Sequence, residues 1–390
     1  MVSPVNHRLH RFEKQITQIF ILAACYLLHV GCSYAQSEKY IRVAIVQNAQ
    51  TLNLKVAGSY EITDSTGEKV LLRGRNLKTT VITSRGGILM AGRFFDNYKI
   101  TIKVSDPDII IINGRKFRGN IQLTINNDAN LLVVNHIELE DYIKGILYHE
   151  ASHYWPMEAL LAQAIISRTY AVYQMQENKL KNYDVTSDIY SQVYGGKSSE
   201  RSRTNKAVDL TLGQILTFQE KVIPAYFHAT CGGYTEDASM LWNIDILPLK
   251  GVPCSFCKDS PHFNWHYVLT LDEIEEKLTK AGLKTGRIKD IAILTKDKSG
   301  RVTDLNMVSS KKDLKISAKD FRNIIGPNII RSTNFTVKVI KQDAVFEGVG
   351  WGHGVGLCQW GAYFMAKQGY TAEQILKYYY PGIDVRALRF

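Results

Sequence analysis

The sequence has only one long apolar run, no excess of acidic residues and none of the common nucleotide-binding signatures. Its 390 residues are 45% hydrophobic and 22% charged, with a mean hydropathy of −0.14. These values exclude a wholly disordered chain and a polytopic membrane protein. The formal net charge of +11 would suit nucleic acid, anionic lipid or an anionic polymer. No RNP-like, homeodomain-like or Walker A pattern is present, so nucleic acid is not expected as a partner.

The single apolar run, Ile19–Val30, lies near the N-terminus and has the features of an export signal. Small residues at Ser33 and Ala35 follow it, and basic residues precede it at Arg8, Arg11 and Lys14. The pattern predicts a signal peptide over residues 1–35 that is cleaved after Ala35. A lipoprotein-type cleavage before Cys32 is the alternative. We therefore expect a periplasmic or envelope-associated protein with no integral membrane segment after cleavage.

Cysteine is scarce, and the spacing of three cysteines is typical of a metal site. His228 and Cys231 form one pair with a two-residue gap, and Cys254 and Cys257 form a second. Three thiols and one imidazole suit tetrahedral zinc. Four protein ligands leave no open position, so the predicted zinc is structural.

The alternative for these cysteines is a disulfide bond, either Cys254–Cys257 or Cys231–Cys254, because an exported protein meets oxidising conditions. Cys358 stands apart from them in the sequence. Two further histidines are reserve ligands: His262 and His266.

The pattern of residue types changes along the chain and predicts an α+β fold. Residues 40–135 hold β-branched runs punctuated by Gly and Asn-Asp. We predict a β-rich accessory domain over residues 36–130 and a second domain of mixed strands and helices over residues 131–390. The accessory domain is expected to dock onto a substrate or a partner.

The sequence predicts two helices and the residue at which each of them begins. Pro156 suits the first position of a helix that runs to about Asn178 with apolar residues at 3.6 periodicity. Arg168 falls on its apolar face, and we expect it to pair with a buried carboxylate. Thr270 is the predicted N-cap of a second helix over residues 271–281.

A five-residue motif, His149-Glu150-Ala151-Ser152-His153, spells HExxH. In zinc metalloproteases this motif lies on a helix, where both histidines bind zinc and the glutamate activates water. Pro156 follows closely and would end or kink such a helix. A zinc metalloprotease is therefore an alternative function.

A longer context around the same glutamate supports another function. Residues 150–171 read E-A-S-H-Y-W-P-M-E-A-L-L-A-Q-A-I-I-S-R-T-Y-A. Residues 184–196 include D-V and Q-V-Y-G-G, and residues 350–362 read G-W-G-H-G-V-G-L-C-Q-W-G-A. These three blocks, in this order, resemble the stage II sporulation protein D family over roughly residues 120–390.

The resemblance implies a peptidoglycan lytic transglycosylase that cuts the MurNAc–GlcNAc bond of peptide-free glycan strands. It makes residues 131–390 the expected catalytic domain and other cell-wall enzymes expected partners. By position, Glu150 is the catalytic glutamate, which makes the HExxH pattern a coincidence. A single glutamate suffices, because the 6-hydroxyl of the substrate attacks the anomeric carbon. We expect apolar walls such as Tyr148 and Trp155 to raise the pKa of Glu150. A non-catalytic wall-binding protein on the same fold is a third possibility.

The same blocks supply the expected substrate-binding residues. Alternating glycines over 348–356 allow close backbone approach to a glycan that stacks on Trp351, or form a tight structural loop. His353 and Gln359 are expected to bind glycan or to orient Glu150. The full predicted binding set is Gln163, Arg168, Tyr170, Gln192, Tyr194, Trp351, His353 and Gln359.

Overall fold

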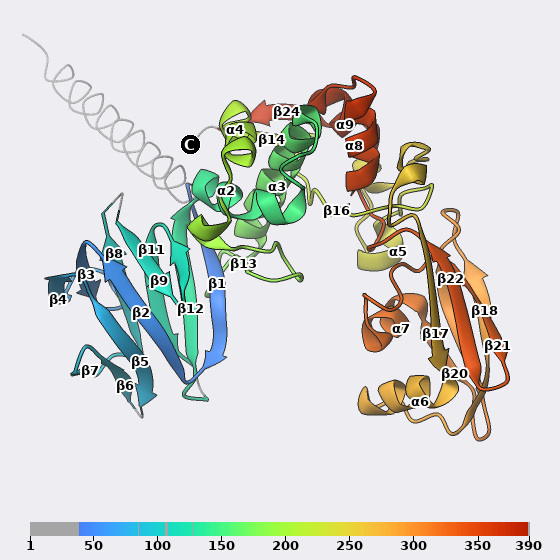
Figure 1. The fold of residues 1–390 in the computed structure, drawn as a ribbon, viewed down its shortest axis with the longest axis horizontal. Coiled ribbons are helices and arrows are strands. Elements are labelled where there is room, and N and C mark those ends of the chain that lie inside the picture. Colours follow the sequence, from blue (N-terminus) through green and yellow to red (C-terminus); the bar gives the residue numbers. More distant parts are fainter. Residues whose placement is uncertain (1–38, 85, 106–107, 127, 389–390) are drawn as a thin grey trace, which may run out of the picture. The chain divides into compact units, whose positions relative to one another are not determined.

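The computed structural model describes residues 39–84, 86–105, 108–126 and 128–388, and Figure 1 shows their helices and strands. They group into two units. The first runs to Tyr142 and also holds Met175–Ser191, and the second holds Ile143–Gln174 and Gln192–Ala387. The α+β fold with β-rich N-terminal sheets is confirmed. The predicted signal peptide lies outside the described residues, and the predicted boundary at residue 130 stays a prediction.

The first unit contains two β-sheets. One has seven strands in the order β13-β1-β12-β11-β8-β3-β4, and the other has six in the order β10-β9-β2-β5-β6-β7. The strands of the first sheet are β1 (Tyr40–Ala49), β3 (Ser59–Thr63), β4 (Val70–Arg75), β8 (Lys99–Val104), β11 (Asn120–Ile125), β12 (Leu131–Glu138) and β13 (Val185–Thr186). Those of the second are β2 (Thr51–Ala57), β5 (Lys78–Ser84), β6 (Gly87–Met90), β7 (Arg93–Phe95), β9 (Ile109–Ile112) and β10 (Arg115–Phe117).

Period-two alternation explains why these segments form half-buried strands. In β2, Leu52, Leu54 and Val56 are buried and every residue between them is exposed. Ile110 and Ile112 of β9 continue the same buried face. One face of the six-stranded sheet is therefore free of core packing.

The segment Met175–Ser191 belongs to the first unit although it follows part of the second in sequence. An ion pair between Arg42 and Asp184 fixes this segment, and the Arg42 Nη2–Asp184 Oδ1 distance is 2.5 Å.

The second unit begins inside α2 (Leu139–Glu150) and is centred on α3 (Met157–Glu177). The predicted helix from Pro156 is confirmed to within one residue at each end. The same unit contains α4 (Ser202–Leu210), α5 (Ser239–Trp242), α8 (Gln359–Lys367), α9 (Ala372–Tyr379), the sheet of β15 (Lys221–Val222), β14 (Gln214–Phe218) and β24 (Asp384–Ala387), and the pair β16 (Phe227–His228) and β23 (Leu357–Cys358). Three single-turn 3-10 helices lie at Gly196–Ser199, Leu247–Leu249 and Phe256–Asp259.

The second unit contains an apolar cluster of buried residues between residues 265 and 346. It is covered by two three-stranded sheets and two helices. These elements are β17 (Asn264–Thr270), β18 (Ile288–Lys296), β19 (Val302–Ser309), β20 (Leu314–Ser317), β21 (Phe335–Ile340), β22 (Asp343–Val349), α6 (Leu271–Lys280) and α7 (Ala318–Ile325). Thr270 forms the predicted N-cap of α6, and with Glu273 it completes a capping box. None of the described helices is long and apolar enough to cross a membrane.

Candidate functional site

Glu150 is the last residue of α2, and its carboxyl group is only partly accessible to solvent. The backbone N–H of Val193 donates to its Oε1 at 3.3 Å. Burial raises the pKa of the Glu150 carboxyl from 4.5 to about 7, although the Val193 hydrogen bond acts in the opposite direction. Among the described residues, no neighbouring charge contributes to this shift. A carboxyl group with this pKa exchanges protons near neutral pH.

A chain of amide side chains holds the backbone at Glu150. Gln359, at the start of α8, donates from Nε2 to the Glu150 carbonyl oxygen at 2.9 Å and to Gln163 Oε1 at 3.3 Å. Gln163 in turn donates to the Ser167 hydroxyl at 3.2 Å. Gln192 donates from Nε2 to the carbonyl oxygen of Ser167 at 3.4 Å. Of these predicted residues, Gln359 holds the Glu150 main chain directly, whereas Gln163 contacts Gln359 and Gln192 contacts Ser167 of α3.

Arg168 is fully buried. Its guanidinium donates to the carbonyl oxygens of Gln214 at 3.1 Å and Val208 at 3.4 Å, and to the Thr211 hydroxyl at 3.5 Å. These three oxygens are neutral, and the carboxylate partner expected from the sequence stays a prediction. Arg168 ties α3 to the end of α4 and the start of β14. Carbonyl oxygens at a helix end are strong acceptors for a buried cation.

The two tyrosines of the predicted binding set are buried. Tyr194 is 1% exposed and Tyr170 is 9% exposed, so neither presents a broad face to solvent. The ring of Tyr194 lies against Gly145 of α2, where an added Cβ would meet it at 2.5 Å. A substrate-binding role for these two residues stays a prediction.

The HExxH residues do not form the geometry of a zinc metalloprotease. Because α2 ends at Glu150, His153 lies in the following turn and not one helical turn after His149. The His149 Nε2 atom lies 2.6 Å from the Ser199 hydroxyl oxygen. The His153 ring instead lies 3.9 Å from the ring of Tyr154, between centroids. Within the described residues, the side-chain group suited to a metal does not include either histidine.

The glycine-rich segment 348–356 packs against protein. Gly354 has a φ of 90°, and a Cβ there would lie 2.5 Å from the Arg301 guanidinium. At Gly356, with a φ of 71°, a Cβ would lie 2.0 Å from the carbonyl oxygen of Tyr226. Only glycine fits such positions. These contacts support the structural-loop alternative for the alternating glycines.

His353 and Trp351 project from this segment into different surroundings. The His353 ring packs on Trp242 and Tyr226, with centroid distances of 5.0 and 6.1 Å. Burial lowers the pKa of His353 to about 3, and nearby Arg322 lowers it further, so this ring is neutral. Trp351 lies between the His262 ring, at 4.8 Å, and the Arg331 guanidinium, at 4.6 Å.

Aromatic side chains also gather just beyond Glu150, and the sequence did not single all of them out. Trp155 packs edge-on against Trp360 at 5.3 Å and against Tyr363 at 5.2 Å, between centroids. Trp360 follows Gln359, so the same helix that holds the Glu150 backbone carries the aromatic neighbour of Trp155. These side chains are partly exposed and offer apolar faces to a sugar ring.

Four buried cysteines form the candidate metal centre. The Sγ atoms of Cys231, Cys254, Cys257 and Cys358 all lie within 4.8 Å of one another, and none is in a disulfide bond. The prediction of Cys231, Cys254 and Cys257 is confirmed as a cluster, but the prediction of His228 as the fourth member is wrong. His228 lies opposite Cys358 in the β16–β23 pair, with its Nδ1 atom 3.1 Å from the Val355 carbonyl oxygen.

The donor set of this cluster fits zinc. Four sulfurs at zinc–sulfur distances of about 2.3 Å form a tetrahedron with edges under 4 Å, which this spacing allows. The backbone N–H groups of Cys231 and Gly361 each donate to Cys358 Sγ at 3.3 Å, and the Tyr379 hydroxyl lies 3.1 Å from Cys254 Sγ. Such contacts stabilise thiolates around a metal. The hydrogen bond from Cys231 lowers the pKa of the Cys257 thiol. The cluster as a whole is consistent with a structural metal such as Zn²⁺.

Comparisons with known proteins identify the family of this chain. A family model described as stage II sporulation protein matches residues 127–218, which include Glu150, Gln163 and Gln192. Stage II sporulation protein D of Bacillus subtilis is 31% identical over 68% of this chain and 79% of its own length. The chain belongs to the stage II sporulation protein D family. This family of cell-wall remodelling proteins includes lytic transglycosylases.

Two further relatives extend the family likeness. An uncharacterized protein of Brachyspira hyodysenteriae is 34% identical over 90% of this chain and 93% of its own length. The amidase enhancer of Bacillus subtilis is 27% identical over 62% of this chain and 39% of its own length. A second family model, a domain of unknown function (DUF8618), matches residues 255–356. That match covers the two small sheets and α6 and α7.

Proposed function

We propose that this protein is an exported peptidoglycan lytic transglycosylase, with Glu150 as its general acid and base. The substrate is the MurNAc–GlcNAc bond of peptide-free glycan strands. The observation that carries the proposal is the Glu150 carboxyl, which has a pKa of about 7 and no charged neighbour that shifts it. Family membership supports the substrate class.

The chemistry needs one residue that first gives a proton and then takes one. Protonated Glu150 donates to the leaving glycosidic oxygen as the bond from that oxygen to the anomeric carbon breaks. The 6-hydroxyl of the same sugar then bonds to the anomeric carbon, and its proton returns to the Glu150 carboxylate. The product is a 1,6-anhydro sugar, and no water is consumed. The Val193 N–H stabilises the carboxylate between the two proton transfers.

We favour this route over hydrolysis because, among the described residues, no second carboxyl group shifts the pKa of Glu150. Most glycoside hydrolases pair two carboxyl groups, and their mutual repulsion shifts at least one pKa. The raised pKa of Glu150 comes from burial alone. Trp155 and Trp360 border the same helix end and provide faces for the sugar rings next to the bond that breaks.

The decisive experiment digests purified peptide-free glycan strands and measures the products by mass spectrometry. Glu150→Gln keeps the shape and the oxygen that accepts from Val193 but cannot exchange a proton. We expect cleavage to fall by roughly 10²–10⁴-fold, while Glu276→Gln, on the exposed face of α6, cleaves normally. Products with reducing ends would identify a hydrolase. Wild-type protein that binds strands without cutting them would identify a non-catalytic wall-binding protein.

We further propose that Cys231, Cys254, Cys257 and Cys358 hold a structural Zn²⁺. With four thiolates bound, the metal has no open position for substrate. It would join the loop at Cys231, the 3-10 helix at Cys257 and the N-terminus of α8. Metal analysis of purified protein checks this directly, and one zinc per chain is the expected result.

A further inference from the structure

The six-stranded sheet of the first unit carries an unusual set of charges. Its strands β2, β5, β6, β7, β9 and β10 contain no Asp or Glu. Their basic residues are Lys55, Lys78, Arg93, Arg115 and Lys116. In the seven-stranded sheet, by contrast, acids and bases pair across strands, as in Arg73–Glu61 at 2.7 Å. The strands of the six-stranded sheet hold no acid that could pair with their bases in this way.

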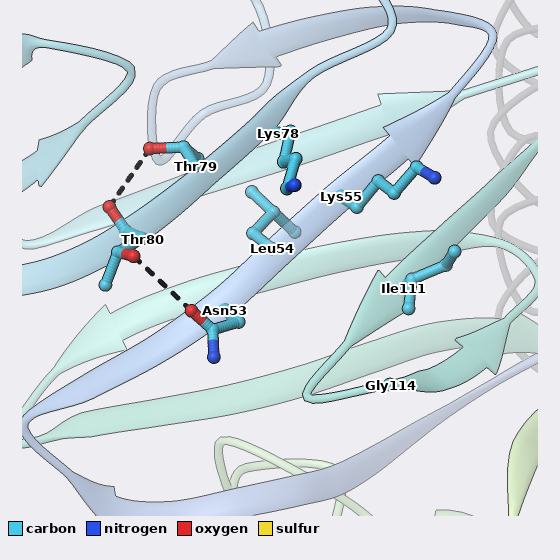
Figure 2. Close-up of a pocket in the computed structure, with 8 residues that line it drawn as sticks. All are labelled: Asn53, Leu54, Lys55, Lys78, Thr79, Thr80, Ile111 and Gly114. Atoms are coloured by element: carbon cyan, nitrogen blue, oxygen red, sulfur yellow. Dashed lines mark hydrogen bonds between the residues drawn. The ribbon is translucent and has the colours of Figure 1, made fainter.

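Three of these cations share one row on the solvent-facing side. Lys55 of β2 lies directly opposite Lys78 of β5 on one side and opposite Ile111 of β9 on the other. Ile111 lies opposite Lys116 of β10. Residues opposite each other in neighbouring antiparallel strands point to the same face. Figure 2 shows the side chains of Lys55, Lys78 and Ile111 in this region.

The placement of Lys55 opposite Lys78 is costly unless an anion accompanies it. Like charges directly opposite in a sheet destabilise the pair, and within the described residues neither lysine forms an ion pair. A hollow of about 430 Å³ lies at this position, lined by both lysines, Asn53, Thr80 and Ile111 among others. This volume falls in the range of small-ligand sites.

The next rows of the same face are neutral and then apolar. Thr80 donates to Asn53 at 3.3 Å, which places two uncharged hydrogen-bonding groups beside the lysines. Beyond them Ile82, Leu89 and Phe94 lie opposite one another across β5, β6 and β7. They are 39%, 38% and 53% exposed. The surface thus offers cations, hydrogen-bonding groups and apolar faces in successive rows.

We propose that this face binds the glycan strand itself and reads the carboxylates of its lactyl groups. A peptide-free strand carries one free lactyl carboxylate per disaccharide, together with hydroxyl and acetamide groups and apolar ring faces. Lys116 and Lys55 are two strands apart, about 10 Å, close to the length of one disaccharide. A polyphosphate would use the lysines but leave the apolar row without a contact. The inference rests on the proposed function, because it gives the same substrate a second site.

Such a site would hold a strand while Glu150 acts on it. Linking two sites that bind one polymer raises the effective concentration of the polymer at the second site. Binding at the sheet should therefore lower the KM for long strands and leave the KM for short fragments unchanged.

The test measures binding of purified peptide-free strands to full-length mature protein that carries Glu150→Gln, so that no cleavage occurs. Adding Lys55→Gln and Lys78→Gln should weaken binding by about tenfold at low salt. The matched control is Lys315→Gln with Lys338→Gln, two exposed strand lysines of the second unit, which should bind as the parent does. Thermal melting of both double variants checks that the fold is kept.

A second measurement separates charge reading from general sugar binding. Neutral chitin oligosaccharides lack lactyl carboxylates, so the Lys55/Lys78 variant should bind them as well as its parent does. Equal strand binding by the two double variants would overturn the proposal, and so would parent protein that binds polyphosphate but not strands. Because binding is measured without cleavage, these outcomes are independent of whether Glu150 acts as proposed.

Discussion

The two units differ in what they bury. Among the described residues of the first unit, the buried polar side chains are Thr63, Gln122, Asn135 and Asp184. The second unit buries many more, including Gln163, Gln192 and Gln359 near Glu150 and Arg168 beside the end of α4. A buried polar group costs free energy unless it is hydrogen-bonded. The second unit bears this cost where Glu150 must be held, whereas the first needs only apolar faces and strand ladders.

The two units therefore differ in which of their residues the proposed functions depend on. Around Glu150 the chain supplies specific partners at fixed distances, so substitutions there should act on chemistry. In the first unit the function we propose lies on an exposed face, so its core and its binding surface are independent of each other. Three predictions test this contrast, from the largest expected effect to the smallest.

The largest effect is expected at the buried cysteine cluster of the second unit. Cys358→Ser removes one of four ligands and also the N-cap of α8, whose sulfur accepts from Gly361. Because metal binding contributes directly to folding free energy, we expect loss of bound zinc and a fall in melting temperature of more than about 10 °C. Calorimetry with and without a chelator measures it. The chelator should lower the wild-type melting temperature and leave that of the variant unchanged.

If the variant kept one zinc per chain and a wild-type melting temperature, Cys358 would not be a ligand. If the chelator lowered the cleavage rate of the wild type without lowering its melting temperature, the metal would be catalytic and not structural.

An intermediate effect is expected at the buried ion pair of the first unit. Asp184→Asn leaves the Arg42 guanidinium, which is 26% exposed, without its carboxylate partner. We expect a loss of about 2–4 kcal/mol in the free energy of unfolding, with wild-type cleavage by the folded fraction. Urea unfolding and a cleavage assay measure the two quantities. A large loss of cleavage in fully folded variant would show that the two units are not independent.

The smallest effect is expected from the pKa of Glu150. Its folded-state pKa, about 7, is above the value of 4.5 in the unfolded chain. The unfolded chain therefore loses its proton first, and stability falls as the pH rises from about 4.5 to about 7. Glu150→Gln lacks this proton, so it should exceed the wild type by about 1–3 kcal/mol at pH 8 and match it at pH 4. Unfolding curves at both pH values measure it, and equal differences would refute the raised pKa.

The helices and strands that depend on residues close together in the sequence could be predicted from the sequence. Pro156 and a 3.6 periodicity located α3, Thr270 located the start of α6, and alternation located the N-terminal strands. The family blocks also brought Gln359 into the predicted site, and it does contact Glu150.

One error came from a pairing between distant segments. The parallel pairing of β16 with β23 places Cys358 beside His228 across 130 residues, and Cys358 takes the place predicted for His228 in the cluster. No signal near His228 in the sequence indicates this pairing. The carboxylate partner expected for Arg168 stays a prediction, and the carbonyl oxygens that Arg168 contacts lie 40 and 46 residues away along the chain.

The hydrogen bond from Gln359 to the Glu150 carbonyl oxygen spans 209 residues. A chain still being synthesised or threaded through an export pore holds Glu150 long before Gln359 and Cys358 arrive. Its amide support and its fourth thiol are then both missing. The wall-cutting centre we propose is therefore completed only when the last helices fold. For the exported enzyme that we propose, the order of the chain therefore delays completion of the site until the C-terminal residues have also been exported.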